Sequence, residues 1–499
     1  MASTHSSQPA RGDSCGSCCG SVPLVSIDPR PCHRVGSHRL HWQSLSRPAD
    51  VQDSRGRTDG PTGVYVPTHR SHLPPLLWVV LLALVIRLPV AAWRWDSLSD
   101  DRDHYRLLAD GLSDGRGLVH PDHGTPTAYR PPLYPLLLAG VSWSGAGQVG
   151  IVALHLLLGL VTVAGTWQTA IHLGLGHRAW WPAAAVGVDP LLVVGATLPM
   201  TETFFTALAV WMLAVATSTP STRRGLTLGL LFGLAALCRP SVWAFAAVTV
   251  LLTLMDLFRK RTPQHWSRHR MAQAALVVGV AVTTGPWLIR NLSVSATPVL
   301  TTTHGGFTLL LGNNPVFYEQ VVRRRLGTTW NDTTSDPGRT PADWRDSLEQ
   351  RLGVPPQGVA AERKRDIKMY RLAMTNVADD PTGFLRACLL RVLRFWTPWP
   401  SESAPGSSWP VALKWAVAAW YAVTSLAMLR GLWSGPWRMG SQWRAPLLYL
   451  LAISLVHVVF WSTMRMRAPV MPIVFLLACV GLVRKPADAA SGDDTLEAY

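Results

Sequence analysis

The chain has 499 residues, of which 48% are hydrophobic and only 15% are charged. A soluble globular protein carries about 25% charged residues, so this composition excludes an ordinary soluble enzyme. In a soluble protein the formal net charge of +16 would suggest a nucleic-acid partner. Here the Lys and Arg residues lie mainly in short loops between long apolar segments, which favours anionic lipid head groups and excludes nucleic acid as the expected partner.

The first 73 residues are polar and rich in Ser, Arg, His, Gly and Pro, without helical or strand periodicity. We expect residues 1–73 to form a disordered cytoplasmic tail. Apolar segments follow, and a helix needs roughly 20 such residues to span a bilayer. The sequence therefore predicts an all-α polytopic membrane protein of about ten spans, at 76–93, 148–173, 180–198, 203–218, 224–238, 241–258, 271–289, 410–430, 445–461 and 469–483.

The basic loops predict which side of the membrane each segment faces, because Lys and Arg accumulate on the cytoplasmic side. If the tail is cytoplasmic and the short apolar segment 132–143 lies flat in the interface, every basic loop falls inside. If 132–143 crosses the membrane instead, the strongest basic cluster, at 259–270, moves outside. The charge pattern thus favours an interfacial helix at 132–143 in a multi-pass protein of a bacterial plasma membrane.

This topology predicts five regions. They are the tail 1–73, a transmembrane catalytic core 74–289 with its first outer loop at 94–147, a large extracytoplasmic loop 290–408 between spans seven and eight, C-terminal transmembrane helices 409–484, and a cytoplasmic tail 485–499.

Two amphipathic helices are predicted in the large loop, near 361–378 and 384–396. In the second, Arg386, Arg391 and Arg394 share an arc of about 140°. We expect that helix to lie on the membrane with its cations near the lipid phosphates, or else to present an ordinary solvated charged face.

Three carboxylates gather at the start of the first outer loop, at Asp100, Asp101 and Asp103. Crowded carboxylates raise one another's proton affinity, which suits a general base, and their oxygens also suit a divalent cation. The alternative is that Asp100 or Asp101 caps a helix running through Tyr105.

Arg130 follows later in the same loop, in front of two prolines. Its planar guanidinium is suited to grip a phosphate at the interface. The alternative is an arginine whose stem lies along apolar surface while its head reaches water. Within the apolar segments, Asp189-Pro190 predicts a proline kink with a hydrogen-bonded aspartate, and His155 and His457 are interpreted as hydrogen-bonded core histidines.

Several short motifs follow one another between residues 76 and 483. They are Asp101 four residues before Tyr105, then Arg130-Pro131-Pro132-Leu133-Tyr134-Pro135, Leu198-Pro199-Met200-Thr201-Glu202, Cys238-Arg239-Pro240, Gly285-Pro286-Trp287-Leu288-Ile289-Arg290-Asn291 and Arg465-Met466-Arg467-Ala468-Pro469. Their order resembles that of the GT-C superfamily of polyprenyl-phosphate-sugar-dependent glycosyltransferases. Among these it is similar to the family 39-type protein mannosyltransferases and to the aminoarabinose and galacturonic acid transferases of lipid A.

The resemblance implies transfer of a sugar from a polyprenyl-phosphate donor to a lipid, glycan or protein acceptor, by direct displacement that inverts the anomeric carbon. It implies that Asp101 is the base or a metal contact, with Asp100 and Asp103 as neighbours in an ambiguous register. Glu202 becomes a second carboxylate, which together with Asp101 would hold a divalent metal. The residues implied to bind the donor phosphate are Arg130, Arg239, Arg290, Arg465 and Arg467.

Two other classes of function share these features. A transporter or flippase of lipid-linked saccharides would place charges near the middle of the membrane and often shows inverted repeats. This sequence instead places its charges at the ends of the predicted spans. A polymerase or ligase of surface glycans would use the same donor class but move an oligosaccharide, so the size of the product separates it from a single-sugar transferase.

Overall fold

The computed structural model describes residues 73–258, 266–331, 335–353, 355–400, 410–435 and 440–483. Within these ranges the regular structure is helical, apart from one isolated β-bridge between Val119 and Pro126. The predicted tails lie outside the described residues, except for Leu73, which begins the first helix.

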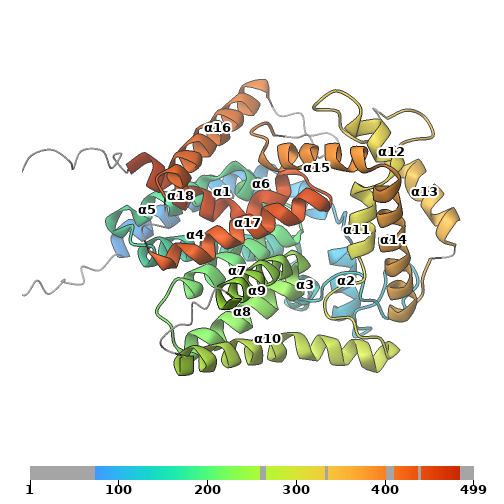
Figure 1. Cartoon of the computed structure of the whole chain (residues 1–499), viewed down its shortest axis with the longest axis horizontal. Helices are drawn as coiled ribbons and strands as arrows, with labels where there is room; N and C mark the ends of the chain where they lie inside the picture. The colour runs from blue at the N-terminus through green and yellow to red at the C-terminus, as the bar shows by residue number, and fades with distance from the viewer. Residues whose placement is uncertain are drawn as a thin grey trace, which may run out of the picture. The chain divides into compact units, whose positions relative to one another are not determined.

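Nine of the ten predicted spans coincide with single helices (Figure 1). These are α1 (Leu73–Trp93), α4 (Gly147–His172), α7 (Thr201–Ala216), α8 (Thr222–Cys238), α9 (Trp243–Phe258), α10 (Trp266–Ser295), α16 (Val411–Trp433), α17 (Arg444–Val459) and α18 (Met471–Val483). Within the described residues, six segments are long and apolar enough to cross a membrane, which indicates an integral membrane protein. That all ten predicted segments cross the bilayer stays a prediction.

The predicted third span, 180–198, is interrupted by a break near its middle. It consists of α5 (Trp180–Val188) and α6 (Pro190–Gly195), separated by Asp189. Asp189 has an extended backbone, and its carboxylate accepts a hydrogen bond from the backbone N–H of Leu192 at 3.0 Å. The proline that begins α6 has no N–H to continue the ladder of α5. The expected kink with a hydrogen-bonded aspartate is thereby confirmed.

Arg87, in the second half of α1, donates hydrogen bonds to the backbone carbonyl groups at this break. Its guanidinium is 3% exposed and donates to the carbonyl oxygens of Val186 at 3.2 Å, Gly187 at 3.1 Å and Leu192 at 3.4 Å. Val186 lies four residues before the proline, so its carbonyl has lost its helical partner. A cation within a membrane bundle is costly unless it is paired, and these carbonyls supply the pairing.

Close packing of α8 against α10 depends on glycines spaced by four residues. A Cβ added at Gly225 would lie 2.1 Å from the carbonyl oxygen of Ala272, and one at Gly229 would lie 2.1 Å from that of Leu276. Small residues at this spacing let two membrane helices bring their backbones together. The two helices lie side by side in Figure 1.

The predicted interfacial helix 132–143 corresponds to α3 (Leu133–Trp143), whose 11 residues are too few to cross a bilayer. It packs against α2 (Tyr105–Ser113), with the rings of Tyr105 and Tyr134 edge to face at 5.2 Å. Its placement flat in the interface stays a prediction.

The predicted boundary of the large loop at residue 290 lies within the last turns of α10, which continues to Ser295. It contains α11 (Gly305–Gly312), α12 (Pro315–Phe317), α13 (Pro341–Leu352), α14 (Val359–Asp379) and α15 (Pro381–Trp396). The two amphipathic helices expected near 361–378 and 384–396 are therefore confirmed as α14 and α15. In Figure 1, α11, α13 and α14 gather at the end of the bundle where α2 also lies.

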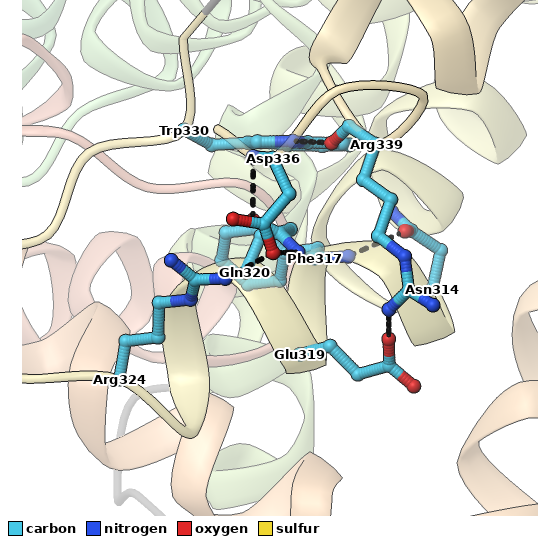
Figure 2. A network of polar contacts seen from close by, with 8 residues as sticks. All are labelled: Asn314, Phe317, Glu319, Gln320, Arg324, Trp330, Asp336 and Arg339. Atoms are coloured by element: carbon cyan, nitrogen blue, oxygen red, sulfur yellow. Dashed lines mark hydrogen bonds and ion pairs between the residues drawn. The ribbon is translucent and has the colours of Figure 1, made fainter. Parts of the chain in front are cut away.

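A network of hydrogen bonds and ion pairs holds together the segment between α12 and α13 (Figure 2). Gln320 donates to the carboxylate of Asp336 at 2.9 Å and accepts from the backbone N–H of Asp336 at 3.2 Å. Arg324 pairs with the same carboxylate, and Arg339 pairs with Glu319. The hydrogen bond from the Gln320 amide, together with Arg324, holds the pKa of Asp336 below its ordinary value. The carboxylate is therefore charged at neutral pH and keeps these contacts.

The arginines of α15 do not face the membrane surface together, and that prediction is wrong. Arg391 is 1% exposed and donates at 2.8 Å to a carbonyl in the last turn of α17, while Arg394 donates to the carbonyl of Thr328 at 2.6 Å. The exposed stripe of α15 includes Leu385 and Leu389, at 66% and 62% exposure, and of the three arginines only Arg386 is exposed. Backbone acceptors inside the protein therefore determine the direction of these guanidinium groups.

We expect the variant Gly229→Ala to destabilise the protein, because the new methyl group would force the backbones of α8 and α10 apart. Overpacking of this kind costs about 1–3 kcal/mol. The measurement is the thermal midpoint of the detergent-solubilised protein. The matched control is Gly285→Ala on α10, where a Cβ would meet nothing within 4 Å. Equal midpoints for the two variants would contradict the packing described for Gly229.

Candidate active site

A single carboxylate shared by two arginines forms the centre of the candidate site. Glu202 lies in the first turn of α7 and is 4% exposed. Its Oε1 lies 2.9 Å from Nε of Arg465 and 3.2 Å from Nη1 of Arg239. Two guanidinium groups and one carboxylate leave an excess of one positive charge. Such an arrangement attracts an anion whose oxygens accept charge-assisted hydrogen bonds.

Helix ends position these three side chains. Arg239 follows the last residue of α8 with an extended backbone, because the proline after it disfavours the helical conformation. Arg465 lies in the 3-10 turn Met464–Val470 that precedes α18. Although Nη1 of Arg239 is close to Glu202, it is buried without an aligned hydrogen-bond acceptor. A buried donor of this kind usually has a partner, and a ligand oxygen would supply one.

Arg130 and Asp103 form a second ion pair. Nη2 of Arg130 lies 2.8 Å from Oδ1 of Asp103, and Nε donates to the Asp103 carbonyl at 3.2 Å. The guanidinium also lies over the rings of Tyr129 at 4.7 Å and Tyr105 at 5.4 Å. Burial alone would lower the pKa of Arg130, but Tyr129, Tyr105 and Asp103 together raise it above its ordinary value, so the residue remains a cation.

Tyr105 connects the two groups. Burial raises the pKa of its phenol to about 12, and Arg130, Asp103, Arg239 and Glu202 all act on it electrostatically. The phenol therefore stays protonated at neutral pH, and the charges of both ion-pair systems act on it. The predicted site residues that the structure brings together are Asp103, Arg130, Glu202, Arg239 and Arg465, which we call the charged cluster.

The two carboxylate oxygens of Asp101 differ in their hydrogen bonds. Its Oδ2 accepts hydrogen bonds from the backbone N–H groups of Arg106 at 2.9 Å and Leu107 at 3.0 Å, in the first turn of α2. The chain reaches that turn through His104, which has a left-handed backbone with φ of 60°. The expected alternative, helix capping, is thus confirmed for Asp101. Its Oδ1 is buried and has no hydrogen-bond partner among the described residues.

Asp100 is engaged locally and is not part of the charged cluster. Its Oδ2 lies 2.6 Å from Nε of Arg102, and both side chains are partly exposed. An exposed pair of this kind contributes little to stability. The structure therefore distinguishes the three neighbouring aspartates, because Asp101 caps α2, Asp103 orients Arg130 and Asp100 faces Arg102.

Arg290, which is predicted to bind the donor phosphate, contacts the first outer loop. Its Nη1 donates to the carbonyl of Thr127 at 2.9 Å and its Nη2 to that of Leu118 at 2.8 Å. Its guanidinium also lies 5.0 Å from the centre of the Trp287 ring. These contacts fasten the loop to the end of α10.

Arg467 is the other predicted phosphate-binding arginine that lies outside the charged cluster. It is 1% exposed and contacts the end of α15. Its Nη1 donates to the carbonyls of Phe395 at 3.3 Å and Thr397 at 3.1 Å. A cation at this position compensates carbonyl groups that the helix leaves unpaired. The guanidinium also lies over the ring of Tyr421 at 4.5 Å.

The residues present do not fit the divalent metal expected at Asp101 and Glu202. Glu202 faces two guanidinium groups, which repel a cation. Across the described residues, no group of three or more His, Cys, Asp or Glu side chains lies close enough to hold a metal ion. The chemistry below is therefore derived from the side chains alone.

The two histidines of the apolar segments are core histidines, as predicted. His155 contacts the hydroxyl of Tyr134 at 2.9 Å and the carbonyl of Ala196 at 2.8 Å. His457 contacts the carbonyl of Trp461 at 3.3 Å. Neither imidazole contributes to the charged cluster.

Sequence analysis missed two groups beside the first outer loop. Glu362, on α14, is a buried carboxylate that bonds to Thr127 and Ala128. His304 lies against the ring of Tyr129 with 4.4 Å between centroids, and its Nδ1 is buried without a partner. Burial lowers the pKa of His304 well below its ordinary value, and Arg130 adds to this effect, so the imidazole is neutral at pH 7. A glutamate within a highly charged helix gives no local signal of such a contact.

No protein-family model matches the chain, and no curated protein does. The structure is similar to the oligosaccharyltransferase AglB of Archaeoglobus fulgidus, in complex with an inhibitory peptide and a dolichol-phosphate. The TM-score is 0.48 at 14% identity, over 82% of this chain and 50% of AglB, so this chain spans about half of that protein. It is also similar to ArnT of Cupriavidus metallidurans bound to undecaprenyl phosphate, with a TM-score of 0.37 at 16% identity, over 81% of this chain and 77% of ArnT.

We expect Asp101→Asn to retain the stability of the wild type, because an asparagine side chain also caps a helix. Asp101→Ala removes the acceptor for two backbone N–H groups and should cost about 1 kcal/mol. The thermal midpoints of the two purified variants measure this difference. A loss in Asp101→Asn equal to that in Asp101→Ala would show that the second oxygen is structural too.

Proposed function

We propose that this chain is a GT-C-type membrane glycosyltransferase that moves a sugar from a polyprenyl-phosphate donor to a lipid, glycan or protein acceptor. The observation that carries the proposal is the sharing of Glu202 by Arg239 and Arg465. These residues lie at the ends of α7 and α8 and before α18, where a lipid-linked phosphate would lie in a membrane. The order of the sequence motifs supports the same class.

In the proposed reaction, the free Oδ1 of Asp101 accepts the proton of an acceptor hydroxyl. The acceptor oxygen attacks the anomeric carbon, and the bond from that carbon to the phosphate oxygen breaks with inversion. The electron pair leaves on the phosphate, so no general acid is needed. Arg239 and Arg465 stabilise the charge that develops there, with Glu202 holding them in place, and Arg130 supplies a third cation for the donor.

We expect Asp101→Asn and Arg465→Ala each to lose most of the sugar transfer. Removing a general base costs about 10²–10⁴-fold in rate, and removing one cation from a developing oxyanion about 10²–10³-fold. The assay measures transfer from radiolabelled polyprenyl-phosphate sugar by folded protein in detergent or vesicles.

The matched controls are Asp114→Asn and Arg116→Ala, from an exposed ion pair in the same outer loop. Full activity in both Asp101→Asn and Arg465→Ala would contradict the assignment of these residues to the active site. Product size gives a further result, because a transferred block would favour a polymerase or ligase over a single-sugar transferase. Flux of labelled lipid without any glycosylated product would favour a flippase.

We also propose that the charged cluster faces the outside of a bacterial plasma membrane. Cysteine introduced at Asp114, next to α2, should then react with a membrane-impermeant maleimide added to intact spheroplasts. Cysteine introduced at Arg178, in the turn between α4 and α5, should react only after the membrane is opened. Both positions are exposed, so accessibility reports the side of the membrane. The opposite pattern would place the cluster on the cytoplasmic side.

A further inference from the structure

The three residues that precede Arg130 are held almost entirely by parts of the chain far from them in sequence. Each of their carbonyl oxygens accepts a hydrogen bond from the end of α10 or from the large loop. The donors are Nη1 of Arg290 to Thr127 at 2.9 Å, the backbone N–H of Thr303 to Ala128 at 2.9 Å, and the hydroxyl of Thr302 to Tyr129 at 2.5 Å. A segment without helix or strand partners is thus fully bonded.

Glu362 holds the donor groups of the same segment. Its Oε1 accepts from the hydroxyl of Thr127 at 2.5 Å, and its Oε2 accepts from the backbone N–H of Ala128 at 2.9 Å and from the hydroxyl of Thr303 at 2.9 Å. The carboxylate is 6% exposed. Hydrogen bonds to a buried carboxylate are short and about twice as strong as neutral ones, so this residue is the main fastening between α14 and the first outer loop.

We propose that Glu362 is a positioning residue that fixes the direction of Arg130, so that α14 contributes to the donor site through the segment that precedes Arg130. Tyr129 is the only residue between the bonded pair Thr127-Ala128 and Arg130, and its ring lies 4.7 Å from the Arg130 guanidinium. A shift of the segment would therefore displace both the guanidinium and the ring beneath it. The catalytic consequence of this inference rests on the proposed function, whereas its structural consequence does not.

A neighbouring carboxylate on α14 provides the matched control. Asp366 lies one helical turn beyond Glu362 and is 1% exposed, so it is at least as deeply buried. Its partners are the backbone N–H of Gly306 at 2.6 Å and Arg363 at 3.0 Å, both within the large loop. Removing either carboxylate should loosen α14, but only the loss of Glu362 should release the Arg130 segment.

The first test is amide hydrogen exchange on the full-length protein in detergent. In Glu362→Ala, the peptide covering 125–130 should exchange at least about tenfold faster than in the wild type, because the Ala128 N–H loses its acceptor. In Asp366→Ala, the same peptide should keep its protection. Thr303→Val removes one donor and leaves the carboxylate in place, so it should give a smaller increase even if Glu362→Ala fails to fold. Unchanged exchange of 125–130 in both Glu362→Ala and Thr303→Val would overturn the inference.

The second test is the split between KM and kcat in the transfer assay. A displaced Arg130 should raise the donor KM of Glu362→Ala about tenfold while kcat changes less, because donor binding is weakened more than the chemical step. Asp366→Ala should leave the donor KM near the wild-type value. Equal KM values for Glu362→Ala and the wild type would overturn the positioning role. If the wild type transfers no sugar while Glu362→Ala still releases 125–130, the contact stands and the proposed function fails.

Discussion

A guanidinium group that is removed from water needs hydrogen-bond acceptors. The positions of these acceptors determine how the buried arginines of this structure join its helices. Arg87 takes the carbonyls that the break at Asp189 leaves free, Arg391 takes a carbonyl of α17, and Arg467 takes the last carbonyls of α15. Each of these residues joins helices through neutral acceptors. Arg239 and Arg465 differ, because they share one carboxylate and keep an excess of positive charge. That difference distinguishes Arg239 and Arg465 from the arginines that contact only neutral acceptors.

Hydropathy was sufficient to place most of the helices, because a membrane-spanning segment must be apolar along its whole length. Hydropathy alone did not indicate the break at Asp189, since α5 and α6 are both apolar, but the Asp189-Pro190 pair predicted it. Periodicity could not orient α15. A helical arc shows that Arg391 and Arg394 lie on one side of the helix, but it does not show whether that side meets lipid or protein. The carbonyl acceptors of Arg391 and Arg394 lie elsewhere in the chain, on α17 and in the loop at Thr328.

The charged cluster was predicted only in part for the same reason. Motif order was enough to nominate Glu202, Arg239 and Arg465, each of which lies at a helix end. The same reasoning also predicted Arg290 and Arg467 as phosphate-binding residues. A motif shows which residues are near one another in sequence, but not the direction in which each side chain points. Glu362 escaped prediction altogether, since 235 residues separate it from Thr127. Contacts at that separation depend on how the two outer loops dock.

The unpartnered atoms limit what a ligand must offer. Arg239 has a buried N–H without an aligned acceptor, whereas Asp101 has a buried oxygen without a donor. Tyr134 interacts electrostatically with both Asp101 and Glu202, the carboxylate beside Arg239. A single anion would satisfy the N–H but be repelled by the carboxylate, and a single cation would do the reverse. An anionic oxygen and a separate hydroxyl donor would satisfy both, and a phosphate-linked donor beside an alcohol acceptor presents that combination.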